Sequence, residues 1–349
     1  MFKPFGLAVY VSAFKQQLPF LEKLKGQHVP IFTSLHIAEE VTDTYVNEVE
    51  EMCQWLHKNE FYIMADVSPY TLEHFGEESL SSLVKRLHID NVRLDFGFDK
   101  KSLGDLFKEV DVTYNASTIL GDEDRVPEAY YMHNFYPRPE TGLDSELFEE
   151  LNREIRAVKG KILAFISGDK MKRGPIFDGL PTLESHRYAA PYAQFVDLIH
   201  RYQVDAAYVG DISLSHQQLK WILAYLEEPI VKLPVILAEA YHYLYDKKLT
   251  VRVDSPKGFI RVQESREFAQ EGEKVEPADA ILRRRGTVTI DNLHYKRYSG
   301  EIQVMKADYP DDTRVNVIGH MPEEYLLLLE NIKNGEQFSF VPINENLQG

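Results

Sequence analysis

The amino-acid sequence predicts an α/β fold, a (β/α)8 TIM barrel followed by a small β-barrel domain. Through the first two thirds of the chain, short runs of β-branched and aromatic residues alternate with amphipathic helical stretches, and this alternation indicates a parallel sheet. Eight such units occur before residue 212, which favours a closed barrel. After Tyr225 the alternation is replaced by short strands separated by turn sequences.

Each predicted barrel strand is a short apolar run that ends in polar residues. The eight strands are Gly6–Val11, Val29–Ser34, Phe61–Asp66, Asn91–Asp95, Val110–Asn115, Tyr130–Phe135, Ile162–Ser167 and Ala206–Asp211. Helical patterns lie between them, for example at Leu18–Lys25, Thr42–Asn59, Leu80–Leu87 and Asp144–Val158. An open doubly wound sheet is the alternative, but no Gly-x-Gly-x-x-Gly follows the first strand, so the usual dinucleotide-binding signal of such sheets is absent.

The last third of the chain is predicted to be a separate, mostly β domain. Its strands are Leu233–Ala238, Thr250–Val253, Phe259–Val262, Thr287–Ile290, Glu301–Val304, Val315–Ile318 and Gln337–Val341, and only Pro322–Ile332 has a helical pattern. Turn sequences such as Ser255-Pro256-Lys257-Gly258 separate the strands. We therefore predict a barrel domain at 1–232 and a β domain at 233–349.

Composition restricts the partners of this protein. The formal net charge of −16 argues against nucleic acid and anionic membranes as general partners, because both favour a positive surface. A single cysteine, Cys53, rules out an internal disulfide framework and a cysteine-based zinc site, and we expect it to be buried. No cofactor and no metal are predicted. The N-terminus lacks the features of a signal peptide, so a cytoplasmic location is expected, and the oligomeric state is left open.

The catalytic residues should lie where the strands end, because the carboxyl ends of the strands of such a barrel form one mouth. Three predicted strands end in carboxylates, Asp66, Asp95 and Asp211. Glu184 opens a later helix and can either stabilise its first turn or point into the mouth. Paired carboxylates suit general acid and base catalysis, including glycosidic cleavage. Each aspartate alone can instead cap a helix or pair with an arginine such as Arg93.

Other polar residues at the strand ends are candidates for substrate binding. Strand two ends in Ser34 and strand five in Asn115, while strand six runs into His133, Asn134, Tyr136 and Arg138. These residues combine hydrogen-bonding groups for hydroxyls with an aromatic ring and a guanidinium for an anion. The loop after strand seven contains Arg173 within a basic, glycine-containing run. Because loops after strands seven and eight of such barrels often bind phosphate, we expect a phosphorylated substrate.

Several of these segments together resemble a known bacterial family. They are His133-Asn134-Phe135-Tyr136-Pro137-Arg138, Arg93-Leu94-Asp95-Phe96-Gly97-Phe98-Asp99, Thr182-Leu183-Glu184 and Arg285-Gly286-Thr287-Val288-Thr289-Ile290-Asp291-Asn292. The chain resembles the 6-phospho-N-acetylmuramidases over nearly its whole length. These are intracellular glycoside hydrolases that split N-acetylmuramic acid 6-phosphate–N-acetylglucosamine, a phosphorylated cell-wall disaccharide. The resemblance implies a (β/α)8 barrel followed by a cyclophilin-like β-barrel.

Under this resemblance, Asp95 and Glu184 are the first-choice catalytic carboxylates, with Asp66 and Asp211 in reserve. Choosing carboxylates from strands four and seven is an analogy with other barrel glycosidases. Arg138, Arg173, Arg252, Arg261 and Arg266 would hold the phosphate and the lactyl carboxylate. Two alternatives stay open: a phosphosugar lyase, aldolase or isomerase, and a sugar-phosphate sensor without enzymatic activity.

Overall fold

The computed structural model describes residues 3–35, 43–94, 109–117, 126–265 and 274–343. The chain divides into two compact units. The first comprises Met1–Arg187 and Tyr202–His216, and the second comprises Tyr188–Arg201 and Gln217–Gly349. Two helices that precede residue 233 in the sequence therefore group with the C-terminal residues.

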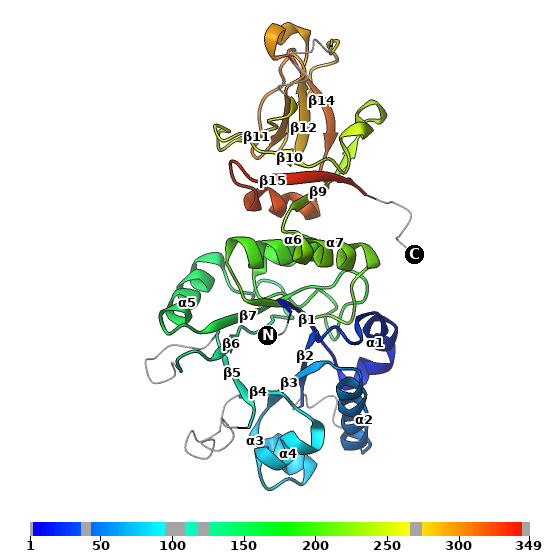
Figure 1. Cartoon of the computed structure of the whole chain (residues 1–349), viewed down its shortest axis with the longest axis vertical. Helices are drawn as coiled ribbons and strands as arrows, with labels where there is room; N and C mark the ends of the chain where they lie inside the picture. Colours follow the sequence, from blue (N-terminus) through cyan, green and yellow to red (C-terminus); the bar gives the residue numbers. More distant parts are fainter. Residues whose placement is uncertain (1–2, 36–42, 95–108, 118–125, 266–273, 344–349) are drawn as a thin grey trace. The chain divides into compact units, whose positions relative to one another are not determined.

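The first unit contains a closed barrel of eight parallel strands, which confirms the predicted barrel (Figure 1). The strands are β1 (Phe5–Ala8), β2 (Pro30–Ser34), β3 (Tyr62–Val67), β4 (Asn91–Leu94), β5 (Asp111–Asn115), β6 (Tyr130–Met132), β7 (Lys161–Ile166) and β8 (Ala206–Val209). They are hydrogen-bonded in chain order, and β8 closes the ring by pairing with β1. All eight carboxyl ends consequently lie at one end of the barrel.

The helices of the first unit lie around the ring of strands (Figure 1). They are α1 (Phe14–Leu21), α2 (Tyr45–Lys58), α3 (Pro69–Phe75), α4 (Leu80–Leu87) and α5 (Ser145–Ala157), together with the short 3₁₀ helices η1 (Val11–Ala13), η2 (Glu22–Leu24) and η7 (Glu184–His186). α4 begins where Ser79 accepts a hydrogen bond from the Ser82 N–H, 3.2 Å away. Helix α5 begins in the same way at Asp144, whose carboxylate accepts from the Leu147 N–H at 2.8 Å.

Alternation along the strands divides the barrel wall into an inner and an outer face. The inner face carries a packed apolar core that includes Phe32, Met64, Met132, Phe165 and Tyr208. Each of these side chains is at most 2% exposed. Because side chains two positions apart share a face, residues that follow this core by two positions project toward the mouth.

The second unit contains a seven-stranded mixed sheet. Its strands are β9 (Val231–Leu237), β10 (Leu249–Thr250), β11 (Phe259–Arg261), β12 (Thr287–Asp291), β13 (Ile302–Met305), β14 (Val315–His320) and β15 (Gln337–Pro342), in the spatial order β10-β15-β9-β14-β12-β13-β11. All seven predicted strands are confirmed. The predicted small β-barrel takes the form of a curled half-barrel, because the edge strands β10 and β11 meet only at an isolated bridge between Val251 and Val262.

The helices of the second unit are α6 (Pro191–Val196), the π-helical turn η8 (Asp197–Arg201), α7 (His216–Glu227) and three 3₁₀ helices, η9 (Glu239–Leu244), η10 (Leu293–Tyr298) and η11 (Glu323–Asn331). The helical pattern predicted at Pro322–Ile332 thus forms η11. Buried hydrogen bonds tie η11 to the earlier helices. Gln218 donates to the Tyr325 hydroxyl at 2.8 Å, and Asn331 donates to the Asp197 carboxylate at 2.8 Å.

Two expectations from composition can be compared with the structure. Cys53 is buried in α2, as predicted. Within the described part of the chain, no helix combines the length and the apolar character needed to cross a bilayer.

Candidate active site

A layer of polar side chains lies above the apolar core at the carboxyl ends of the strands. Ser34, Asp66 and Asn134 follow Phe32, Met64 and Met132 by two positions, so they share the inner face. Asn115 pairs in register with Met132 and faces the same way. The structure therefore brings together four residues that the sequence predicted for this site.

An ion pair between neighbouring strands is at the centre of this layer. Asp66 and Arg93 occupy paired positions on β3 and β4. Arg93 Nη1 donates to Asp66 Oδ1 at 2.8 Å, and Nη2 donates to Asn134 Oδ1 at 2.6 Å. Both charged side chains are less than 10% exposed. One guanidinium thus fixes a carboxylate and a carboxamide in the mouth, with charge-assisted hydrogen bonds that are stronger than neutral ones.

His133 directly follows strand β6 and does not point into the mouth. Its ring is fully buried, packs against Phe148 of α5 and shares a 2.8 Å hydrogen bond with Asn152 of the same helix. Burial lowers the pKa of His133 to about 4, so the ring is neutral at pH 7. The expectation that His133 binds a sugar hydroxyl is not supported, because residue 133 alternates with the inward-facing residues 132 and 134.

Glu184 is held by four donors, and its contacts are those of a carboxylate that organises a loop. Its oxygens accept from the backbone N–H groups of Glu140 and Gly142, both at 2.8 Å. They also accept from Arg187 Nε and Nη2, both at 2.6 Å. The hydrogen bonds from Arg187 contribute most to lowering the pKa of Glu184 to about 2. Gly142 approaches so closely that an added Cβ would lie 2.7 Å from Glu184 Oε2.

Asp211 has a similar organising position after β8. The backbone N–H groups of Gly168, Arg173 and Leu180 donate to its carboxylate at 2.8, 2.9 and 3.3 Å. The side chain is 1% exposed, and this burial raises its pKa despite the three hydrogen bonds. Asp211 thereby joins the loop after β7 to the end of β8.

Arg173 brings a positive charge to the end of β1. Its guanidinium lies over the ring of Tyr10, with 3.9 Å between the guanidinium carbon and the ring centroid. The Tyr10 hydroxyl in turn donates to the Gly210 carbonyl at 2.6 Å. Tyr136 and Arg138 follow β6 as a loop whose carbonyl groups accept from Arg187 Nη2, and the Arg138 side chain is exposed.

The remaining predicted site residues lie in the second unit or outside the described residues. Arg252 donates twice to Asp254, at 2.9 Å each, and Arg261 donates to Glu301 at 2.8 Å. Both arginines are therefore paired with carboxylates. Asp95 and Arg266 lie outside the described residues. Among the residues described, no group of three or more His, Cys, Asp or Glu side chains is placed to hold a metal ion.

Two residues with important contacts were not among the predicted site residues. The sequence suggests Arg93 only as a partner for an aspartate, although its guanidinium connects Asp66 with Asn134. Arg187, with a fully buried side chain, fixes Glu184 and the loop after β6. Strand alternation could have identified Arg93, because its position on the fourth strand pairs with Asp66. No sequence signal distinguishes Arg187 from an exposed helical arginine.

Comparisons with known proteins agree with this arrangement. Residues 5–224 match the family model described as 6-phospho-N-acetylmuramidase, N-terminal, and residues 231–341 match the corresponding C-terminal model. A crystal structure of a conserved Enterococcus faecalis protein of unknown function is 30% identical, with a TM-score of 0.82 over 98% of this chain and 96% of that one. An uncharacterized B. cereus protein is 24% identical, with a TM-score of 0.77 over 98% and 100%. No curated protein matches the chain.

Proposed function

Because this chain belongs to the 6-phospho-N-acetylmuramidase family of glycoside hydrolases, we propose that it hydrolyses N-acetylmuramic acid 6-phosphate–N-acetylglucosamine. The observation that carries the proposal is the buried Asp66–Arg93–Asn134 cluster at the carboxyl ends of the barrel strands. Carboxylate, guanidinium and carboxamide groups at this end of a barrel are suited to bind and cleave a sugar.

We assign the catalytic carboxylates to the ends of β3 and β4. Asp66 is the described member, and Asp95, which follows β4 in the sequence, is the second on sequence grounds. Glycosidic cleavage needs one group to protonate the leaving oxygen and another to attack or to activate water. Glu184 and Asp211 are less suited to these reactions, since their oxygens are engaged by loop N–H groups and, for Glu184, by Arg187.

The anionic part of the substrate is assigned to the region of Arg173. Its guanidinium lies over Tyr10 at the end of β1, and the basic residues Lys170 and Lys172 are close in the sequence. Asn115, Asn134 and Ser34 would hold sugar hydroxyls. Arg252 and Arg261 are left out of this assignment because each already pairs with a carboxylate.

The resemblance to the family supports three finer parts of the proposal. The C-terminal half-barrel would be a variant of the cyclophilin-like fold, the enzyme would act in the cytoplasm, and its product would enter recovery of cell-wall sugars. A phosphorylated disaccharide would be the small-molecule partner, with no cofactor required.

Incubation of the full-length protein with the phosphorylated disaccharide tests the proposal. Release of free N-acetylglucosamine is expected, and Asp66→Asn and Asp95→Asn should each lower kcat at least about 100-fold. The matched control is Asp111→Asn, at the opposite end of the barrel, which should remain active. Binding of the disaccharide without release would contradict hydrolysis and favour the sugar-phosphate sensor.

A further inference from the structure

One face of the sheet in the second unit is polar although it is largely shielded from solvent. Along β11, β12 and β13, the residues of one face are apolar and at most 2% exposed, namely Ile260, Ile290, Ile302 and Val304. The opposite face carries Arg261, Asp291, Glu301 and Gln303. A polar sheet face is ordinarily open to water, yet Asp291, Glu301 and Gln303 are only 5–7% exposed.

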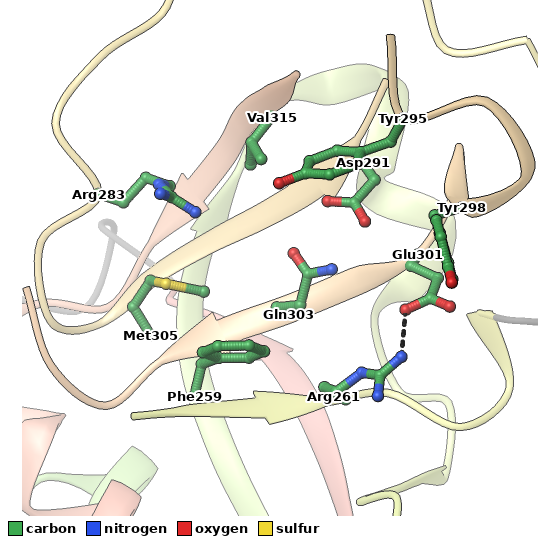
Figure 2. A pocket seen from close by; sticks show the side chains of 10 residues that line it. All are labelled: Phe259, Arg261, Arg283, Asp291, Tyr295, Tyr298, Glu301, Gln303, Met305 and Val315. Atoms are coloured by element: carbon green, nitrogen blue, oxygen red, sulfur yellow. Dashed lines mark hydrogen bonds and ion pairs between the residues drawn. The ribbon is translucent and has the colours of Figure 1, made fainter. Parts of the chain in front are cut away.

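These polar side chains line a pocket of about 250 Å³ (Figure 2). In the figure, Phe259 and Tyr295 lie on opposite sides of the group, with Asp291 and Gln303 between them. Tyr295 and Tyr298 come from η10, and Arg283 comes from the segment before β12. The Tyr295 hydroxyl donates to Asp312 at 3.2 Å, which fixes that wall of the pocket.

The charges around the pocket are balanced. Arg261 donates to Glu301 at 2.8 Å. Arg283, whose Nε donates to the Pro310 carbonyl at 2.8 Å, is the other cation of the lining. Burial raises the pKa of Asp291 to about 7, so this carboxylate is costly to keep charged. A buried carboxylate that destabilises the folded protein when it is charged, and that lies in a concave site with aromatic walls, is characteristic of a binding site.

We propose that this pocket binds a neutral monosaccharide ring, with N-acetylglucosamine as a representative ligand. Carboxylate, carboxamide and guanidinium groups can accept from and donate to neighbouring hydroxyls. Phe259 and the two tyrosines offer apolar surface to the C–H faces of a sugar. The balance of two cations and two carboxylates disfavours a phosphate or a polyamine, and the volume suits a single ring. The proposal goes beyond hydrolysis at the barrel and does not rest on it.

The proposal is tested by isothermal titration calorimetry, in which the full-length protein is titrated with N-acetylglucosamine and, separately, with glucose. We expect saturable binding at one site with a Kd of about 1 mM or tighter, which is reasonable for a ligand of this size. Asp291→Leu should weaken binding at least tenfold without loss of folding, because it removes a buried carboxylate. Tyr298→Ala, at an exposed position, should also weaken binding. Glu330→Gln, outside the pocket, is the control.

The barrel variant Asn134→Ala separates this site from the barrel mouth, since it should leave neutral-sugar binding at the pocket unchanged. Binding that is lost in Asn134→Ala but retained in Asp291→Leu and Tyr298→Ala would overturn the proposal. The absence of sugar binding, or saturable binding of inorganic phosphate or putrescine instead of either sugar, would overturn it as well.

Discussion

Two carboxylates of this protein, one half-buried and one buried, have opposite effects on the stability of the fold. Glu184 accepts four hydrogen bonds, and Arg187 beside it is fully buried. Asp291 is buried with its pKa raised, beside a pocket. The Glu184–Arg187 pair stabilises a loop at the barrel mouth, whereas the buried charge of Asp291 lowers the stability of the folded protein. Substitution of each carboxylate by its amide should therefore change stability in opposite directions.

Glu184→Gln is expected to lower the free energy of unfolding by about 3 kcal/mol, because it leaves the buried Arg187 guanidinium without its carboxylate. The pKa of Glu184 is about 2 in the folded protein, below its ordinary value of 4.5. Its stabilising contribution is thus complete above about pH 4.5 and is lost as the pH falls toward 2. Urea unfolding at pH 7 and at pH 3 measures both effects. Glu150→Gln, exposed on α5, should show neither.

Asp291→Asn is expected to stabilise the protein at high pH. The folded-state pKa of about 7 exceeds the ordinary value of 3.8, so the folded state retains a proton that the unfolded state loses. Stability therefore falls as the pH rises from about 4 to about 7, by at most roughly 4 kcal/mol. The neighbouring charges are Glu301, Arg261 and Arg283. Thermal unfolding of the wild-type protein and of Asp291→Asn at pH 5 and pH 8 tests this prediction. The same change in melting temperature between the two pH values for both proteins would contradict it.

Strand alternation decides which predicted site residues reach the mouth of the barrel. The sequence correctly places the strands, and it predicts that Ser34, Asp66, Asn115 and Asn134 gather at their ends. It also groups His133 with Asn134, although neighbouring residues on a strand face opposite sides. The roles of Glu184 and Asp211 could not be predicted, because they depend on loop N–H groups that come together only when the loops fold.

His133 and Asn134, the two residues that directly follow β6, provide an internal comparison. Asn134→Ala should lower kcat/KM for the phosphorylated disaccharide at least about tenfold and lower the free energy of unfolding by about 1.5 kcal/mol, because Arg93 Nη2 loses an acceptor. His133→Ala should instead cost about 3 kcal/mol, because it empties a buried site and leaves the Asn152 carboxamide without its partner. Urea unfolding and steady-state kinetics of both variants test the assignment. The opposite pattern would show that the faces are exchanged.

Each of the two compact units of the chain is made of segments that are separate in the sequence. The helical segments Tyr188–Arg201 and α7 precede the C-terminal sheet, yet they belong to the same compact unit as that sheet. The sequence could not reveal this grouping, because helices of a barrel and helices that pack on another layer have the same amphipathic pattern. What joins them is a set of specific contacts, including a 2.8 Å hydrogen bond from the backbone N–H of Ala190 to the Glu324 carbonyl.

A chain that ends at residue 229 should therefore not fold as an independent barrel. It would retain α6, η8 and α7 but lose η11. The Trp221 ring and the buried Gln218 would then lose Tyr325 as a partner, and the buried Asp197 would lose Asn331. Exposure of such surface favours aggregation over cooperative folding. Circular dichroism during heating should show no sharp transition for this chain, whereas the full-length protein should unfold in one sharp transition. If the shorter chain instead unfolded cooperatively within about 5 °C of the full-length protein, the contacts with η11 would contribute little to the stability of these helices.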